Sequence, residues 1–142
     1  MTILQSEIAV GSEQYQQNRD ALLSQIAEVR AVQQKGIDKS YAAKPKFDKK
    51  GKILPHERVR LLLDADSPFV ELCGLVGYNM HDDKDGSEAG GGIIAGIGFV
   101  SGVRALVTAS NSAIKGGTMS PMGVQKNQFQ QHSAQAQEAN KD

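Results

Sequence analysis

Apolar side chains recur at helical spacing in the segment that follows Gly11. Five of them fall on one stripe, namely Tyr15, Leu22, Leu23, Ile26 and Val29. The other face of this segment carries Gln, Asn, Arg and Glu, as expected for a helix on a surface or against a partner. Ser12 is a favourable N-cap, and Gly36 is suited to stop the helix. The pattern therefore predicts one helix over residues 13–34.

The following stretch, residues 37–53, is rich in Lys and shows almost no periodicity, so an exposed connector is expected there. Pro55 then suits the first turn of a helix, because it has no N–H group to leave unpaired. The apolar stripe of this second helix consists of Val59, Leu62 and Leu63. We expect a short helix over residues 55–63.

Strand patterns begin after this helix. Alternation over residues 68–76 predicts a strand that contains Cys73 as a core thiol. Two apolar runs, residues 92–100 and 103–109, are separated only by the dipeptide Ser101-Gly102. Such a dipeptide between strand-forming runs predicts a β-hairpin with a two-residue turn.

The C-terminal segment has a different character. Residues 125–142 are poor in large apolar side chains and contain six Gln. A segment of this composition buries little surface, so a frayed helix or disorder is expected.

Charge and composition exclude several classes of function. Sixteen Lys and Arg balance sixteen Asp and Glu, so the net charge gives no argument for binding nucleic acid or an anionic membrane. A single Cys excludes an internal disulfide and fits a reducing compartment. No leader pattern and no apolar run near the ~20 residues needed to span a bilayer is present. A cytoplasmic location is expected.

Motifs that resemble ligand-binding loops do not meet their requirements. A dinucleotide-binding loop needs its glycines between a strand and a helix, whereas Gly96 and Gly98 lie inside a strand pattern. The three glycines at residues 90–92 are better explained by a close approach of two backbone segments at the start of the hairpin. The loop with His81, Asp83 and Asp85 lacks the first and last ligands of a calcium loop, so a solvated loop is expected. His56, between a proline and a glutamate at a helix start, is interpreted as a surface residue. We therefore predict no catalytic residue and no metal site.

Three ordered blocks carry a resemblance to a known family. Residues 51–72 (GKILPHERVRLLLDADSPFVEL) resemble the "GKLLPRERV..LLLD.GSPFLEL" opening of that family. Residues 90–103 (GGGIIAGIGFVSGV) resemble its "GGGIVTGIGRVSGV" hairpin, and residues 111–121 (NSAIKGGTMSP) resemble its "ND.TVKGGTYYP" stretch. The family comprises the carboxyltransferase (β) subunits of biotin-dependent acyl-CoA carboxylases of the methylcrotonyl-CoA or geranyl-CoA type.

The resemblance implies an α/β fold: the incomplete N-terminal part of a crotonase (ClpP-like) domain with a long helix, a short helix and a hairpin. Expected segments are an N-terminal helix (1–36), a basic connector (37–54), the start of the acyl-CoA carboxyltransferase domain (55–124) and a polar, disordered or non-native tail (125–142). The "SGGA"-type segment whose backbone N–H groups form the family's oxyanion hole does not follow residue 121. We therefore expect a truncated or frame-shifted chain that is inactive alone.

The implied activity is transfer of a carboxyl group from carboxybiotin to an enoyl-CoA in leucine or isoprenoid catabolism. Biotin would be carried by a partner α subunit, and the β subunits would form a homo-oligomer. Lys115, Gly116, Gly117 and Thr118 are the candidate acyl-CoA-binding residues, because glycines let backbone approach an anion closely. A strand-exit turn that merely needs glycine geometry is the alternative. A non-enzymatic assembly module and a non-functional product are the alternative functions.

Overall fold

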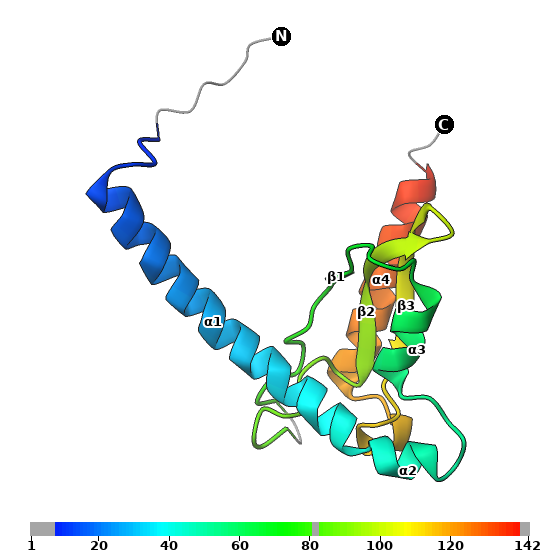
Figure 1. Cartoon of the computed structure of the whole chain (residues 1–142). Coiled ribbons are helices and arrows are strands. Elements are labelled where there is room, and N and C mark those ends of the chain that lie inside the picture. Colours follow the sequence, from blue (N-terminus) through cyan, green and yellow to red (C-terminus); the bar gives the residue numbers. More distant parts are fainter. Residues whose placement is uncertain (1–7, 81–82, 140–142) are drawn as a thin grey trace. The chain divides into compact units, whose positions relative to one another are not determined.

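The computed structural model describes residues 8–80 and 83–139. The chain divides into two units, one ending at Ala31 and one beginning at Val32. The elements in chain order are α1 (Glu13–Ala42), α2 (Lys44–Asp48), α3 (Pro55–Leu62), β1 (Val70–Glu71), β2 (Ile93–Val100), β3 (Val103–Ser110), the short turn η1 (Lys115–Gly117) and α4 (Pro121–Ala139) (Figure 1). No helix in the described part of the chain is long and apolar enough to cross a membrane.

The first unit contains the start of α1. Ser12 caps the helix as predicted, because its Oγ accepts the N–H of Tyr15 at 3.2 Å. Three side chains of the predicted apolar stripe are exposed, namely Leu22, Leu23 and Val29. This part of α1 thus presents apolar side chains that its own unit does not cover.

In the second unit α1 continues to Ala42, so the predicted stop at Gly36 is wrong. Gly36 is buried, and a Cβ at this position would lie 3.5 Å from the carbonyl oxygen of Ala89. The glycine therefore serves a close approach between the helix and a loop rather than a helix end. The expected connector is partly helical as well, because α1 and α2 occupy much of residues 37–54.

The hairpin of β2 and β3 is confirmed. The two strands pair antiparallel up to Val100 opposite Val103. Ser101 and Gly102 both have positive φ angles, 52° and 77°, as a type I′ turn requires. The carboxylate of Asp64 accepts both turn N–H groups, from Ser101 at 2.6 Å and from Gly102 at 2.7 Å.

The predicted strand over residues 68–76 is much shorter in the structure. Only Val70–Glu71 form β1, which pairs antiparallel with β2 and gives the sheet order β1-β2-β3. The chain then turns away, and Cys73 adopts a φ angle of 53° and is exposed. The interpretation of Cys73 as a core thiol is therefore wrong.

The apolar core lies between the hairpin and α3. Val59, Ile94 and Val107 form its buried centre, and partly buried apolar side chains surround them, namely Leu63, Phe69, Val100, Ala105 and Ala109. Helix α3 begins at Pro55 as predicted and directs Val59 into this core.

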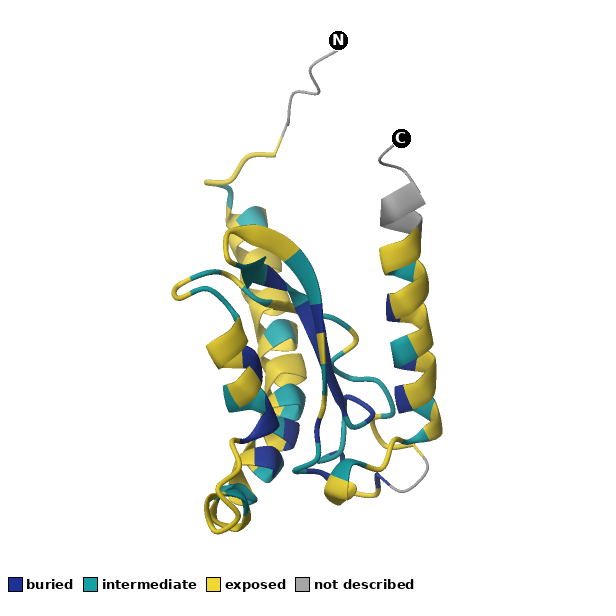
Figure 2. Cartoon of the chain, turned by 90° about the vertical axis from the view of Figure 1, so that its right-hand side faces the viewer, coloured by how far each residue is buried: buried dark blue, intermediate teal, exposed yellow. Residues whose placement is uncertain are grey.

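Helix α4 covers the opposite face of the hairpin (Figure 2). Of the two alternatives expected for the C-terminal segment, a helix and disorder, the described residues 125–139 form the helix. Polar side chains of α4 are buried in its contact with the rest of the chain, since Lys126 is 2% and Gln130 is 1% exposed. Composition alone carried no sign that these two residues would be buried.

Candidate functional site

The stretch Lys115-Gly116-Gly117 forms an unusual turn. Its three φ angles are 48°, 67° and 93°, so the backbone is left-handed at each residue. The N–H of Gly117 donates to the carbonyl of Ile114, and the N–H of Thr118 donates to that of Lys115. Glycine accepts this backbone without steric cost, whereas Lys115 does not. The strain at Lys115 marks the turn as a place of functional interest.

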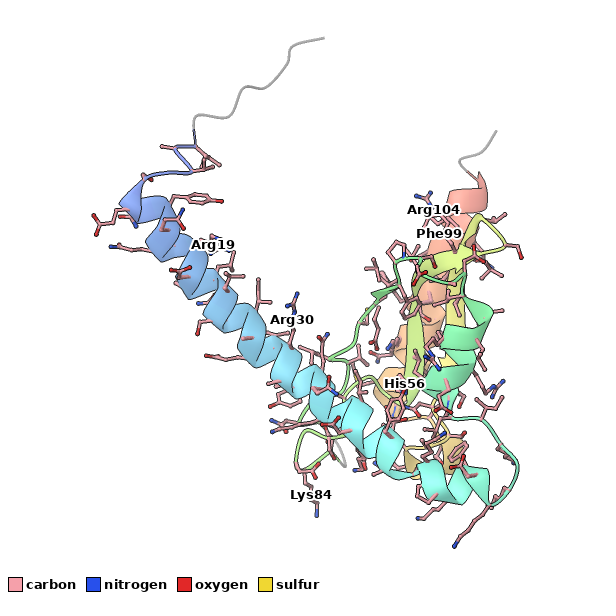
Figure 3. All side chains as sticks on the ribbon, in the orientation of Figure 1. Arg19, Arg30, His56, Lys84, Phe99 and Arg104 are labelled. Carbon is pink, nitrogen blue, oxygen red and sulfur yellow. The ribbon has the colours of Figure 1, made fainter. Side chains whose placement is uncertain are left out.

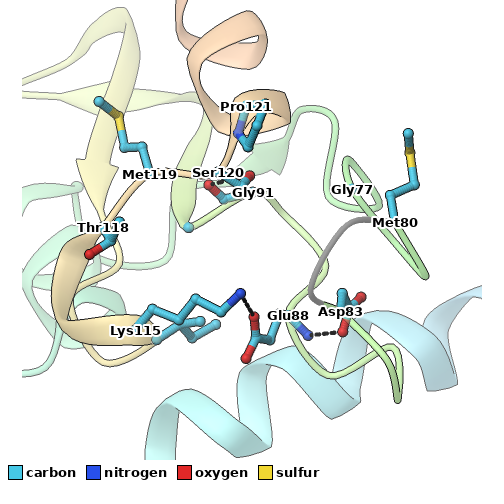
Figure 4. A pocket seen from close by; sticks show the side chains of 12 residues that line it. Gly77, Met80, Asp83, Glu88, Gly91, Lys115, Thr118, Met119, Ser120 and Pro121 are labelled. Carbon is cyan, nitrogen blue, oxygen red and sulfur yellow. Dashed lines mark hydrogen bonds and ion pairs between the residues drawn. The ribbon is translucent and has the colours of Figure 1, made fainter.

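A cavity of about 120 Å³ lies beside this turn (Figure 4). Lys115, Thr118 and Ser120 line one part of it, and Asp83 and Glu88 line another. The start of α4 and the glycines before β2 complete the wall, so the positive end of a helix dipole lies at the cavity. Two of the four predicted substrate-binding residues, Lys115 and Thr118, are therefore placed together at one cavity.

Glu88 is the central charged group of this cavity. One carboxylate oxygen lies 2.8 Å from the Nζ of Lys39, and the other lies 2.6 Å from the Nζ of Lys115. Burial by itself would raise the pKa of Glu88, but the hydrogen bonds from Lys115 and Lys39 outweigh it and hold the pKa below its usual value. Glu88 is thus ionised at neutral pH between two ammonium groups.

Asp83 holds the loop that carries Glu88. It is 6% exposed, and its carboxylate accepts the N–H groups of Asn79 at 3.1 Å and Glu88 at 3.0 Å. The prediction of a merely solvated loop therefore fails at Asp83. His81, the first residue of the calcium-loop comparison, lies outside the described residues. No group of three metal-ligating side chains occurs among residues 8–80 and 83–135, whose side chains the structure describes.

The glycines before β2 permit the predicted close backbone approach. A Cβ on Gly91 would lie 2.8 Å from the Cα of Gly123 in the first turn of α4, so the two backbones touch. Lys126, one turn later, donates to the carbonyl oxygens of Gly90 at 3.3 Å and Ile93 at 2.7 Å. These contacts fix the start of α4, and hence the wall of the cavity, against the hairpin.

His56 belongs to a second polar cluster, at the start of α3 (Figure 3). Its Nδ1 lies 3.1 Å from the Oγ of Ser40, and that hydroxyl donates to the Oδ1 of Asn111 at 3.2 Å. The Tyr41 ring stacks on the imidazole with centroids 6.0 Å apart. The side chain is half-buried, which lowers its pKa, so the interpretation as a surface residue is wrong. This cluster ties α1 to the end of β3.

Lys126 and Glu71 form a further pair of perturbed groups. Burial lowers the pKa of Lys126, while the charge of Glu71 opposes this shift. Burial raises the pKa of Glu71, while Lys126 opposes it. Each charge therefore offsets part of the desolvation cost of the other.

The arrangement around Lys115 fits the binding of an anion. It combines two lysines, a helix N-terminus and left-handed backbone that lets a ligand approach closely. Sequence reasoning found Lys115 through its glycines but missed Lys39 and Glu88. Lys39 lies in the segment expected to be a connector, and Glu88 lies in the loop expected to be solvated.

Comparison with known proteins gives a consistent result. The family model described as the carboxyl transferase domain matches residues 46–141. The β subunit of geranyl-CoA carboxylase from P. aeruginosa has a similar structure, with a TM-score of 0.81 and 52% sequence identity over 93% of this chain. The predicted α/β architecture, that of the N-terminal part of a carboxyltransferase subunit, is thereby confirmed.

Curated relatives point to the same family. The probable mitochondrial methylcrotonoyl-CoA carboxylase β chain of Drosophila melanogaster is 33% identical over 94% of this chain. The β1 subunit of the biotin-dependent 3-methylcrotonyl-coenzyme A carboxylase of Mycobacterium tuberculosis is 45% identical over 59% of it. This chain spans only 23% and 15% of those proteins, and 24% of the geranyl-CoA carboxylase chain.

Proposed function

Because this chain belongs to the carboxyl transferase domain family, we propose that it is part of an acyl-CoA carboxylase β subunit that transfers a carboxyl group from carboxybiotin to an enoyl-CoA. The observation that carries the proposal is the 52% identity to the geranyl-CoA carboxylase β subunit over nearly the whole chain. Methylcrotonyl-CoA and geranyl-CoA are the candidate substrates, since relatives named for both are similar to this chain.

The role of this segment is to bind the acyl-CoA. Lys115 and Thr118 line the cavity, whereas Gly116 and Gly117 do not. Lys115 supplies a cation there, and the nearby start of α4 adds its helix dipole. The chemistry of the cavity suits a phosphate group of CoA rather than the reacting carbon. We propose that residues 1–142 act as a binding segment and do not catalyse carboxyl transfer by themselves.

The proposals on biotin and on the partner subunits follow from membership of the family. The biotin would be carried covalently by an α subunit, and β subunits would assemble with one another. A cytoplasmic location is our proposal, supported by the single cysteine, which fits a reducing compartment.

Equilibrium binding of CoA to the 142-residue chain tests the binding role. We expect Lys115→Met to weaken CoA binding about tenfold, because a charge-assisted contact to a phosphate is lost. Lys84→Met is the matched control, since Lys84 is an exposed lysine that does not line the cavity. Equal affinities of the Lys115→Met variant and the parent chain would contradict the role of Lys115.

An activity assay tests the second part of the proposal. With a biotinylated partner and bicarbonate, the 142-residue chain should not carboxylate methylcrotonyl-CoA or geranyl-CoA. Turnover by this chain would refute its inactivity.

The second candidate is a non-enzymatic assembly module, favoured by the exposed Leu22, Leu23 and Val29 of α1. In that case the chain should co-purify with a full-length β subunit. Replacement of all three residues by Glu should abolish the interaction, whereas a parent chain that never associates would count against this candidate.

A further inference from the structure

The carboxylate of Glu88 bridges two lysines that are far apart in the sequence. Lys39 lies in the last turn of α1, and Lys115 begins η1. Both ammonium groups contact Glu88, one at each carboxylate oxygen, at 2.8 Å and 2.6 Å. Lys39 also donates to the Oγ of Ser87 at 2.9 Å. The fold thus gathers two cations at one point, where a single carboxylate balances half of their charge.

The carboxylate is held more firmly than the lysines. The side chain of Glu88 is 16% exposed, against 39% for Lys39 and 36% for Lys115. Its backbone N–H is fixed by the buried Asp83. The lysines therefore remain accessible to a ligand from solvent, while Glu88 stays in place as an internal anion.

We propose that Glu88 is the resident counter-ion of a two-lysine phosphate site, and that a phosphate group of the acyl-CoA takes over the contact of its carboxylate with Lys115. This inference rests on the proposed function of the Lys115 turn. It adds Lys39 as the second cation of the site and Glu88 as the residue that sets its affinity and selectivity.

The charges explain why a counter-ion is useful. Two lysines face the carboxylates of Glu88 and Asp83, which both line the cavity, so the site carries no net charge and a weakly charged anion gains little by displacing Glu88. A phosphate offers more negative charge and more acceptor oxygens than a carboxylate, so it competes better for the ammonium group of Lys115. Glu88 thus lowers the affinity for all anions but favours phosphate esters over carboxylates.

Glu88→Gln in the 142-residue chain is the direct test. The amide keeps the shape but removes the negative charge, so CoA should bind about three- to tenfold more tightly, with a steeper dependence on salt. Acetate and inorganic phosphate serve as probes of selectivity, and the variant should discriminate less between them. Lys39→Met should weaken CoA binding in the parent chain and should reduce the gain of Glu88→Gln.

The outcomes separate this inference from the proposed function. If Lys115→Met weakens CoA binding but Glu88→Gln leaves it unchanged or weaker, the counter-ion role is overturned and the binding role of the turn stands. If neither Lys115→Met nor Lys39→Met changes CoA binding, both proposals fall. Circular dichroism melting identifies a Glu88→Gln variant that does not fold. The Lys39→Met result then tests the two-lysine site, and unchanged CoA affinity refutes that site and with it the need for a counter-ion.

Discussion

The two faces of the hairpin are covered in opposite ways. On the α3 face, apolar side chains meet apolar side chains, and Gly96 and Gly98 let Phe69 and Leu63 approach the strand. On the α4 face, the helix is seated by Lys126 and Gln130. One face is therefore held by close apolar packing, and the other depends on hydrogen bonds and burial of polar groups.

The difference shows where each face is sensitive. Apolar packing is non-directional but intolerant of added volume, so the α3 face should fail when an atom is added. A polar contact in a low-dielectric interior is stabilising only when its partners are satisfied. On the α4 face, a substitution that removes a hydrogen bond should therefore lower the stability of the protein, and one that replaces an unpaired polar group should raise it.

The largest effect is expected from Gly96→Ala on the α3 face. The added Cβ would lie 2.5 Å from both the Phe69 ring and the carbonyl oxygen of Val70. Since the backbone of β1 cannot move away cheaply, we expect a loss of about 3 kcal/mol in the free energy of unfolding, measured by urea denaturation. Gly11→Ala is the control, because nothing lies within 4 Å of a Cβ there. If both substitutions changed the free energy of unfolding equally, close packing around Gly96 would not be the cause of the effect.

Lys126→Met on the α4 face should cost about 2 kcal/mol, since charged hydrogen bonds to Gly90 and Ile93 are lost. The pKa of Glu71 should then rise further, because burial remains and the opposing lysine charge is gone. Urea denaturation at neutral pH and NMR titration of the Glu71 carboxyl measure the two effects. A stable variant with an unchanged Glu71 titration would show that Lys126 does not hold α4 in place.

Gln130→Leu should act in the opposite direction. Within the part of the chain that the structure describes, the Nε2 and Oε1 of Gln130 are buried and have no hydrogen-bond partner. Replacing this amide by an apolar side chain of similar size removes its desolvation cost, so the free energy of unfolding should rise by about 1 kcal/mol. The same substitution at the exposed Gln131 is the matched control. Destabilisation by Gln130→Leu would mean that this amide is in fact satisfied.

The smallest effect is a pH dependence that comes from His56 beside the α3 face. Its folded pKa lies below the ordinary value of 6.5, so the unfolded chain binds more protons as the pH falls. The contribution of His56 is therefore present above pH 6.5 and is lost as the pH falls through 6.5 toward the lower folded pKa. Melting temperatures between about pH 8 and about pH 5 should fall less steeply for His56→Gln than for the parent chain. An equal slope in both proteins would remove His56 as the cause.

Local sequence signals were sufficient for one part of the fold. The Ser101-Gly102 turn, the Ser12 cap and the proline start of α3 depend on neighbouring residues, and the structure contains all three. The signals at Gly36 and Cys73 were misleading because tertiary contacts decide both. Gly36 lies in a helix to accommodate a loop, and Cys73 follows a strand that ends after two residues.

The site was only partly visible in the sequence. Glycine spacing indicated the turn at Lys115, because left-handed backbone needs those residues. Lys39 and Glu88 carried no such signal, since charged residues in polar segments are usually solvated. Their meeting depends on the continuation of α1 past Gly36 and on the burial of Asp83, neither of which is encoded by a local pattern.

The Asp64 contact with the hairpin turn has a practical consequence for labelling this protein. A two-residue turn on an exposed hairpin is a common place to insert a tag or a fluorophore. Here the Asp64 carboxylate accepts both turn N–H groups, so an insertion would break both contacts between the turn and the end of α3. The turn at Gly51 is the better choice. A Cβ there would have no neighbour within 4 Å, and the surrounding lysines are exposed.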